Sequence, residues 1–270
     1  MENVVRVQTD DIGRMDPNEL EKQIIEVKKS GRVPLMVMAS AGTTVLGTFD
    51  QLDLISDICK KHNVWMHTDV SDSFTGIIRN WDYPPLSNSV AWNFHKWSAV
   101  PIQCSAFVVN QKGLMEKCNA TSAEYLFQPD KFYDTSYDIG DKTIQCGRRV
   151  DVLKLWLMWK ARGDKGLGEV VDRSFENAGY LLKKLKTTEG FKLVYPEFQC
   201  TNISFWYIPP RLRGKPETPE WWAEIGKVAP KIKERMMMSG SCMIQYQPLS
   251  SKGFVNFFRV IVENPALWTC

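Results

Sequence analysis

His95 and Lys96 lie together in an apolar stretch, WNFHKWSAV, at residues 92–100. A lysine that is removed from water becomes a better amine nucleophile, because burial disfavours its charged form. The alternative is a lysine at a strand end whose stem packs on apolar neighbours while its ammonium group stays in water. Buried lysines are rare, so this stretch alone favours a lysine whose ammonium group stays in water. Other parts of the sequence are needed to choose between the two interpretations.

Asp69 follows a second short apolar run, VWMH, at residues 64–67. A lysine that can bond to an aldehyde, a carboxylate that can face a pyridinium nitrogen, and an imidazole beside the lysine together suggest pyridoxal phosphate chemistry. A buried aspartate beside the ring nitrogen keeps that nitrogen protonated, and the ring can then withdraw electrons. A helix or turn cap is an equally good interpretation of Asp69 from this stretch alone.

The first half of the chain alternates between short apolar runs and amphipathic segments. The segment after Asp16 and the one over residues 54–59 predict helices. Strands are predicted at residues 35–40, 64–69, 89–93 and 104–109. This alternation predicts an α/β fold with a mostly parallel sheet that is covered on both faces. Ligands of such sheets bind beyond the carboxyl ends of the strands, so Asp69 and the His95–Lys96 pair are candidates to meet at one edge.

Residues 113–149 interrupt this pattern with a charged, aromatic-rich segment of the kind that forms functional loops or partner-contacting arms. The elements predicted after it are helices at 150–163 and 166–190, strands at 191–196 and 202–208, a helix at 220–238, and strands at 242–249 and 256–264. Strands clustered with intervening helices predict a small α+β domain at residues 161–270, after a large domain at residues 1–160.

Composition narrows the class of protein. The net charge is +3, from 34 basic and 31 acidic residues without a charged block, so composition favours neither nucleic acid nor membrane as a partner. The N-terminus has no signal pattern and no apolar run is long enough to span a bilayer, which predicts a soluble, cytoplasmic protein. The 7 cysteines include no CxxC pair and the 3 histidines match no ligand spacing, so we expect reduced thiols and no metal.

Longer stretches carry a family resemblance. They are MASAGTTVLGTFD, WNFHK followed by QCSAFVV, EYLFQPDKFYDTSYDIGDKTIQCGRRVDVLKLWLMWKARG, FWYIPPRLRGK, and QYQPL with NFFRVIVENP. The chain resembles the group II pyridoxal-phosphate decarboxylases, most closely the cysteine sulfinate and acidic amino acid decarboxylases related to glutamate decarboxylase. The resemblance implies the large-domain half of a fold type I pyridoxal-phosphate-dependent transferase plus most of its small domain. It also implies pyridoxal 5'-phosphate as cofactor, cysteine sulfinate, aspartate or glutamate as substrate, and a homodimer with sites at the subunit interface.

The same resemblance implies roles for individual residues. Lys96 would bond to the cofactor, with His95 as its neighbour in the motif, and Asp69 would be the partner of the pyridinium nitrogen. Tyr125, in EYLFQ, would be a mobile-loop tyrosine that donates a proton after carbon dioxide leaves. Arg259, in NFFRV, would pair with a substrate carboxylate through two parallel hydrogen bonds. Without the resemblance, a core tyrosine and a strand-edge arginine would be the better interpretations.

The chain also departs from the family pattern. Phe94 replaces a proline just before His95, which relaxes the backbone there. HTDVSDSF, at residues 67–74, replaces small residues with bulk and an added negative charge, which could hinder cofactor binding. The family's phosphate-binding segment would lie before Met1 and its last helix after Cys270. The resemblance therefore predicts a truncated chain with impaired activity.

Two other functions stay open at this point. The same cofactor could support transamination, although EYLFQPDKFYD with Tyr125 favours decarboxylation. The chain could also be a non-catalytic paralogue or fragment that associates with decarboxylase subunits. Cofactor spectroscopy separates the second alternative from the enzymes, and product analysis separates the two reactions.

Overall fold

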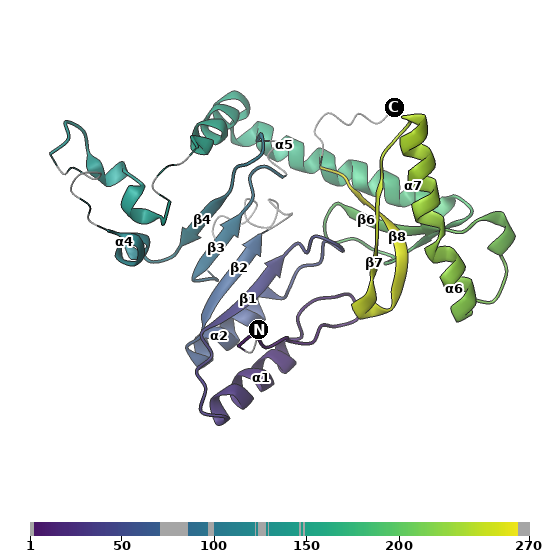
Figure 1. Cartoon of the computed structure of the whole chain (residues 1–270), viewed down its shortest axis with the longest axis horizontal. Coiled ribbons are helices and arrows are strands. Elements are labelled where there is room, and N and C mark those ends of the chain that lie inside the picture. Colours follow the sequence, from purple (N-terminus) through teal and green to yellow (C-terminus); the bar gives the residue numbers. More distant parts are fainter. Residues whose placement is uncertain are drawn as a thin grey trace.

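The computed structural model describes residues 3–70, 86–96, 100–121, 123, 128, 130–145, 147 and 149–263. Two four-stranded sheets lie next to each other, and one long helix, α5 (Asp151–Thr187), runs along both (Figure 1). Among the described residues, no helix has the length and apolar character needed to cross a membrane.

The first sheet has the strand order β1-β2-β3-β4. Its strands are β1 (Met36–Ala41), β2 (Trp65–Val70), β3 (Ser89–Trp92) and β4 (Ala106–Val109). The first three strands run parallel and β4 is antiparallel to β3. The predicted mostly parallel sheet is therefore confirmed, and each strand overlaps the apolar run that predicted it.

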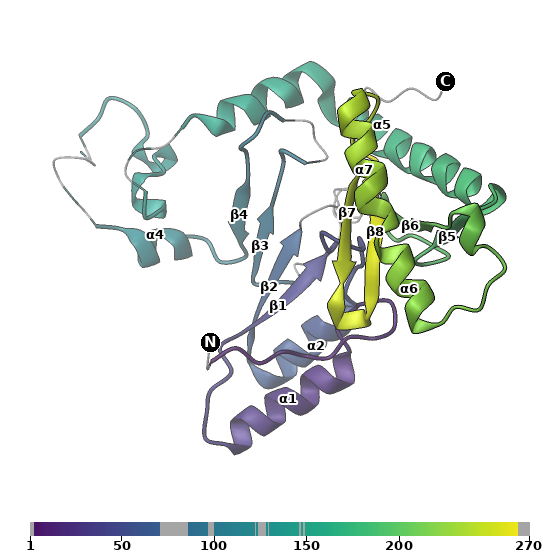
Figure 2. The same ribbon diagram turned by 45° about the vertical axis from the view of Figure 1, so that its right-hand side comes forward.

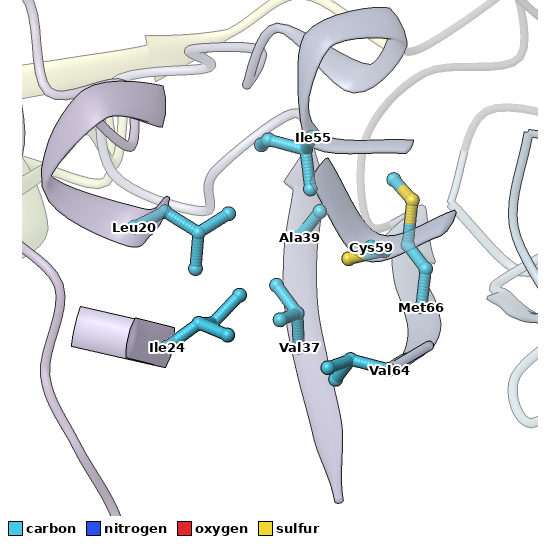
Figure 3. Close-up of a cluster of buried hydrophobic side chains, with 8 residues drawn as sticks. All are labelled: Leu20, Ile24, Val37, Ala39, Ile55, Cys59, Val64 and Met66. Atoms are coloured by element: carbon cyan, nitrogen blue, oxygen red, sulfur yellow. The ribbon is translucent and has the colours of Figure 1, made fainter. Parts of the chain in front are cut away.

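Two helices, α1 (Pro17–Lys29) and α2 (Leu52–His62), cover one face of this sheet. The α1 helix begins where the sequence predicted, because the Asp16 carboxylate accepts hydrogen bonds from the backbone N–H groups of Asn18 and Glu19. The buried core between these helices and the sheet (Figure 3) consists of Leu20, Ile24, Val37, Ala39, Ile55, Cys59, Val64 and Met66. All of these residues are aliphatic or sulfur-containing.

The opposite face of the first sheet is only partly covered by the described residues. Side chains alternate along each strand, so Met36 and Met38 point away from α1 and α2. Met38 is 57% exposed, and Phe107 of β4 is 52% exposed. The described residues thus cover this second face only in part, and its full coverage stays a prediction. The apolar runs identify strands, but packing between distant elements decides which faces are covered.

Helix α5 contains the two helices that the sequence predicted, joined at a kink. Gly163 has φ 65° and ψ 177° inside the helix, a conformation that glycine adopts far more readily than other residues. The predicted domain boundary near residue 160 lies close to this kink, and that division of the chain stays a prediction. Residues on the N-terminal side of α5 pack near β3 and β4, and its C-terminal half packs against the second sheet.

The second sheet is antiparallel and has the strand order β5-β6-β8-β7. Its strands are β5 (Phe191–Leu193), β6 (Asn202–Tyr207), β7 (Gln245–Leu249) and β8 (Phe254–Ile261). Helices α6 (Pro219–Gly226) and α7 (Val228–Ser239) replace the single helix predicted at residues 220–238. Pro230 explains the break, because its ring is incompatible with helical packing against the carbonyl group of Gly226, four residues earlier.

The region predicted as a long loop contains helix α4 (Leu114–Asn119). Short 3-10 helices occur at Thr135–Tyr137 (η1), Gly140–Lys142 (η2), Pro210–Leu212 (η3) and Ser250–Lys252 (η4). Both views show helix α4, at the start of the predicted arm at residues 113–149, lying away from the two sheets (Figures 1 and 2). A role for this arm in contacting a partner stays a prediction.

Candidate active site

The carboxyl ends of β1, β2 and β3 lie at one edge of the first sheet, because these strands are parallel neighbours. Asp69 is the second-last residue of β2 and pairs with Ala91 of β3. The chain leaves β3 after Trp92 and reaches His95 and Lys96 within one short turn. The structure thus brings Asp69 and the His95–Lys96 pair to the same edge, in agreement with the sequence prediction.

A tight turn holds His95 and Lys96 beyond the end of β3. The backbone N–H of Lys96 donates to the carbonyl of Asn93 at 3.2 Å, and that of His95 donates to the carbonyl of Cys104 at 3.1 Å. The side-chain Nδ1 of His95 lies 2.7 Å from the same Cys104 carbonyl oxygen and 3.2 Å from the Cys104 backbone nitrogen. Since one ring nitrogen cannot donate and accept at once, the shorter contact favours a proton on Nδ1. Nε2 of a neutral His95 is then the acceptor.

Phe94 anchors this turn in the core. It is buried, and its ring centroid lies 4.3 Å from that of Trp92. The buried residues of its cluster are Phe94, Val100, Cys104, Leu167, Val171 and Cys200. Where the family resemblance expects a proline that restricts the backbone, this chain therefore holds the turn through side-chain packing.

Lys154 of α5 binds the backbone of the segment that connects β3 and β4. Its Nζ donates to the carbonyl groups of Pro101 at 3.1 Å and Gln103 at 2.7 Å, and it pairs with the carboxylate of Asp151 at 2.7 Å. These bonds tie the segment that follows Lys96 to the start of α5. The sequence did not reveal this role, because Lys154 looks like an ordinary surface residue in a helical pattern.

The cysteine next to this turn is a packing residue. Burial raises the pKa of the Cys104 thiol, and its Sγ lies 3.6 Å from the carbonyl oxygen of Asp151. A neutral, buried thiol is a poor nucleophile. The described cysteines, Cys59, Cys104, Cys118, Cys200 and Cys242, form no disulfide bond with one another.

Arg259 approaches this edge from the second sheet. It lies in β8 between Ser204 of β6 and Gln245 of β7. Its Nη1 donates to the carbonyl of Thr44, in the loop that follows β1, and the Nδ2 of Asn202 donates to the same carbonyl at 3.3 Å. Arg259 Nε is buried without a hydrogen-bond partner. The guanidinium group is therefore held in place by Thr44, while its Nε–H makes no hydrogen bond.

The loop at residues 42–49 fits closely against β6. Gly47 has φ 67°, and a Cβ added there would lie 2.9 Å from the Cβ of Cys200 and 3.0 Å from that of Asn202. Real Cβ atoms do not approach so closely, so this position requires glycine. The backbone N–H of Phe49 also donates to the side chain of Gln199 at 2.9 Å. These contacts join the edge of the first sheet to the second sheet.

Asp50 holds the end of β1 beside Asp69. Its carboxylate accepts the backbone N–H of Ser40 at 2.7 Å and that of Met15 at 2.7 Å, and Ser40 pairs with Asp69 in the sheet. The sequence did not reveal this role of Asp50 either. The motif MASAGTTVLGTFD ends on Asp50, but its position before α2 is also typical of a helix cap.

Two predicted features lie outside the described residues. These are Tyr125 and the substituted positions at residues 72–74. The predicted role of Tyr125 and the effect of the substitutions on cofactor binding therefore stay predictions.

The residues at this edge fit pyridoxal phosphate by their chemistry. Lys96 supplies an amine, Asp69 supplies a carboxylate from the neighbouring strand, and His95 is oriented by Cys104. Asp69 would stabilise the protonated ring nitrogen and Lys96 would bond to the aldehyde carbon. Arg259 would face the acidic group of a substrate.

Comparisons with known proteins agree with this chemistry. The family model of the pyridoxal-dependent decarboxylase conserved domain matches residues 2–208. The chain is 51% identical to a bovine acidic amino acid decarboxylase, GADL1, over 98% of this chain and 51% of that protein. It is 48% identical to human cysteine sulfinic acid decarboxylase, over 98% of this chain and 54% of that protein.

A solved structure shows the same fold. The crystal structure of mouse CSAD in apo form superposes with a TM-score of 0.89 at 44% identity, over 99% of this chain and 56% of that one. The chain thus has the fold of the fold type I pyridoxal-phosphate-dependent enzymes and spans about half the length of the curated relatives it matches. The family model alone matches well over half of the chain. The chain belongs to the pyridoxal-dependent decarboxylase family.

Proposed function

We propose that this protein is a pyridoxal-phosphate-dependent decarboxylase of small acidic amino acids, namely cysteine sulfinate, aspartate or glutamate. The observation that supports this proposal is that Asp69, near the end of β2, and Lys96, just after β3, lie at the carboxyl ends of neighbouring parallel strands, with Arg259 bound to Thr44 in the loop after β1. The names of the relatives support an acidic substrate. The free thiols suit a reducing compartment such as the cytoplasm.

Each residue of the site has a distinct task in this reaction. Pyridoxal phosphate, when bound, withdraws electrons from the α-carbon of the substrate. Asp69 holds the proton on the ring nitrogen by charge, and Lys96 contributes the amine that holds the cofactor. Arg259 pairs with a substrate carboxylate and orients it. Tyr125 gives a proton to the α-carbon as carbon dioxide leaves, which suits a residue on a closing loop.

The first experiment tests Lys96 directly. The purified chain is incubated with pyridoxal phosphate, reduced with borohydride and digested for peptide mapping. We expect the label on the WNFHK peptide, and no label there in Lys96→Arg, because a guanidinium group does not react with the aldehyde. A label mainly on Lys60 or Lys112 would contradict the assignment.

The second experiment measures the reaction itself. Carbon dioxide release is followed with cysteine sulfinate, aspartate and glutamate, and the products are identified. Decarboxylation of at least one acid is expected, and a keto acid product would instead indicate transamination. Absence of turnover together with absence of a label on Lys96 would favour the second candidate below.

Arg259 can be tested separately from the cofactor. Removing one member of a desolvated charge pair costs about 2–5 kcal/mol, so Arg259→Ala should weaken substrate binding strongly and cofactor binding little. Arg259→Lys keeps the charge but loses the planar fork, and we expect a partial loss. Equal loss of substrate and cofactor binding would indicate a folding role for Arg259.

A second candidate function is a non-catalytic subunit that associates with decarboxylase chains. The exposed apolar side chains on the first sheet, including Met38 and Phe107, favour association, as do Phe132 and Tyr137 on the arm. We also propose that the active form is a homodimer. Sedimentation of the chain alone tests for the homodimer. Sedimentation of the chain mixed with an active relative tests the subunit candidate, which predicts that the two chains associate and that this chain alone has no turnover.

A further inference from the structure

One face of the second sheet carries polar atoms that are buried without a hydrogen-bond partner. They are Asn202 Oδ1, Ser204 Oγ, Gln247 Nε2 and Arg259 Nε. Asn202 and Ser204 are only 4% and 8% exposed. A buried polar atom without a partner is costly, and native proteins contain few of them. Three of these atoms, Ser204 Oγ, Gln247 Nε2 and Arg259 Nε, can donate hydrogen bonds, which indicates that an acceptor group of a ligand completes this region.

The strand register places these four residues on one face. Ser204 pairs directly with Arg259, and Asn202 lies two residues before Ser204. Gln247 pairs with Phe257, two residues before Arg259. Since side chains two residues apart on a strand share a face, the four side chains point to the same side.

The contacts to Thr44 show where this face points. Its carbonyl accepts hydrogen bonds from both Asn202 and Arg259, so the face is directed toward the loop that follows β1. That loop begins at the same sheet edge that carries Asp69. A ligand on this face would thus lie at the junction of the two sheets.

We propose that Ser204 and Gln247 join Arg259 in binding a carboxylate group of an acidic ligand. This inference rests on the proposed function and adds two binding residues to the same site. Arg259 Nε–H, the Gln247 amide and the Ser204 hydroxyl can all donate, and a carboxylate offers about four acceptor positions. Asn202 Oδ1 can only accept, so Asn202 holds Thr44 and takes no part in carboxylate binding.

The probe for this site is glutarate, a dicarboxylate without an amino group. Its binding to the full chain is measured by calorimetry and by the shift of the NMR signal of Arg259 Nε–H. This signal is assigned from its absence in the spectrum of Arg259→Lys. We expect glutarate to bind and to shift this signal, and glutaramide, its neutral diamide, to do neither. Loss of one hydrogen bond to a charged group should weaken glutarate binding about 10- to 100-fold in Ser204→Ala and in Gln247→Met.

The thermal stability of the ligand-free variants provides a second readout, which is expected to change in the opposite direction to glutarate affinity. Ser204→Ala removes a buried hydroxyl without a partner, so the Tm without ligand should stay equal or rise while glutarate affinity falls. Thr201→Val is the matched control. Thr201 Oγ1 is also buried without a partner, but strand alternation places Thr201 away from Ser204 and Arg259. We expect Thr201→Val to leave glutarate binding unchanged.

Three outcomes would overturn the inference. They are no glutarate binding by the unaltered chain, unchanged affinity in both Ser204→Ala and Gln247→Met, and a lower Tm with unchanged affinity in Ser204→Ala. Failure of the proposed function looks different, because a chain that releases no carbon dioxide would still bind glutarate through Ser204, Gln247 and Arg259.

Discussion

The two sheets differ in how completely the described residues cover them. Every large hydrophobic residue in the strands of the second sheet is at least partly buried, whereas β1 and β4 of the first sheet have exposed ones, including Met38 and Phe107. The second sheet packs against α5, α6 and α7, and the first sheet is covered mainly by α1 and α2 on one face. The second sheet therefore forms a more complete hydrophobic core. The exposed apolar side chains of the first sheet would need contacts beyond the described residues to be buried.

The chemistry of the two cores differs as well. The core between the first sheet and helices α1 and α2 contains no aromatic residue among its buried members, whereas Trp206 in the second sheet makes edge contacts with Trp222, Phe254 and Phe257 at ring-centroid distances of 4.9–6.0 Å. Such aromatic pairs contribute stability beyond the area they bury. The second sheet can thus hold Arg259 rigidly, while Lys96, the proposed cofactor lysine, lies at the less covered first sheet.

The largest expected effect follows from the aromatic core. Phe257 is fully buried, so Phe257→Ala should reduce the free energy of unfolding by about 3–5 kcal/mol, measured by urea denaturation. Phe257→Leu keeps most of the volume and should cost much less. A loss below about 1 kcal/mol in Phe257→Ala would show that this core is less important than its packing indicates.

A matching substitution probes the first sheet. Ile55 is fully buried on the face of α2 that packs against the first sheet, and Ile55→Ala should reduce the free energy of unfolding by about 2–5 kcal/mol. Hydrogen exchange should show lost protection in β1 and β2 but not in β6 and β8, because the two sheets have separate cores. Equal loss of protection in both sheets would mean that they unfold as one unit.

The pH dependence of stability tests the covered face of the first sheet. Burial raises the pKa of the Cys59 thiol from 9.0 to about 11. The folded state therefore prefers the protonated thiol, and this contribution is fully present below pH 9 and lost as the pH rises to 11. The loss should reach about 2 kcal/mol. Cys59→Ala should lower this alkaline slope in urea denaturation, and an unchanged slope would show that Cys59 is not the group responsible.

The smallest effect on stability is expected on the partly covered face. Met38→Gln replaces an exposed side chain, so the free energy of unfolding should change by no more than about 0.5 kcal/mol. Self-association, measured by sedimentation, should decrease, because apolar contact area is lost. A large loss of stability in the isolated chain would show that Met38 is already packed in solution.

The sequence by itself determined the local elements and the edge at which the chemistry lies. The Asp16 cap, the alternating apolar runs and the glycine at position 163 act over a few residues, so each can be recognised from its neighbours. Asp69 and Lys96 could be placed at one edge because parallel strands align their carboxyl ends. The break before Pro230 was also encoded locally, although the prediction of one helix overlooked it.

Only the tertiary structure decided how distant segments complete the site. Arg259 meets Thr44 across 215 residues, and Asp50 joins Met15 to the end of β1. No short-range pattern specifies such pairs, because they depend on how the two sheets pack. The same holds for the partly exposed face around Met38: its sequence is that of a buried strand, and whether another element covers it is decided by packing between elements far apart in the chain.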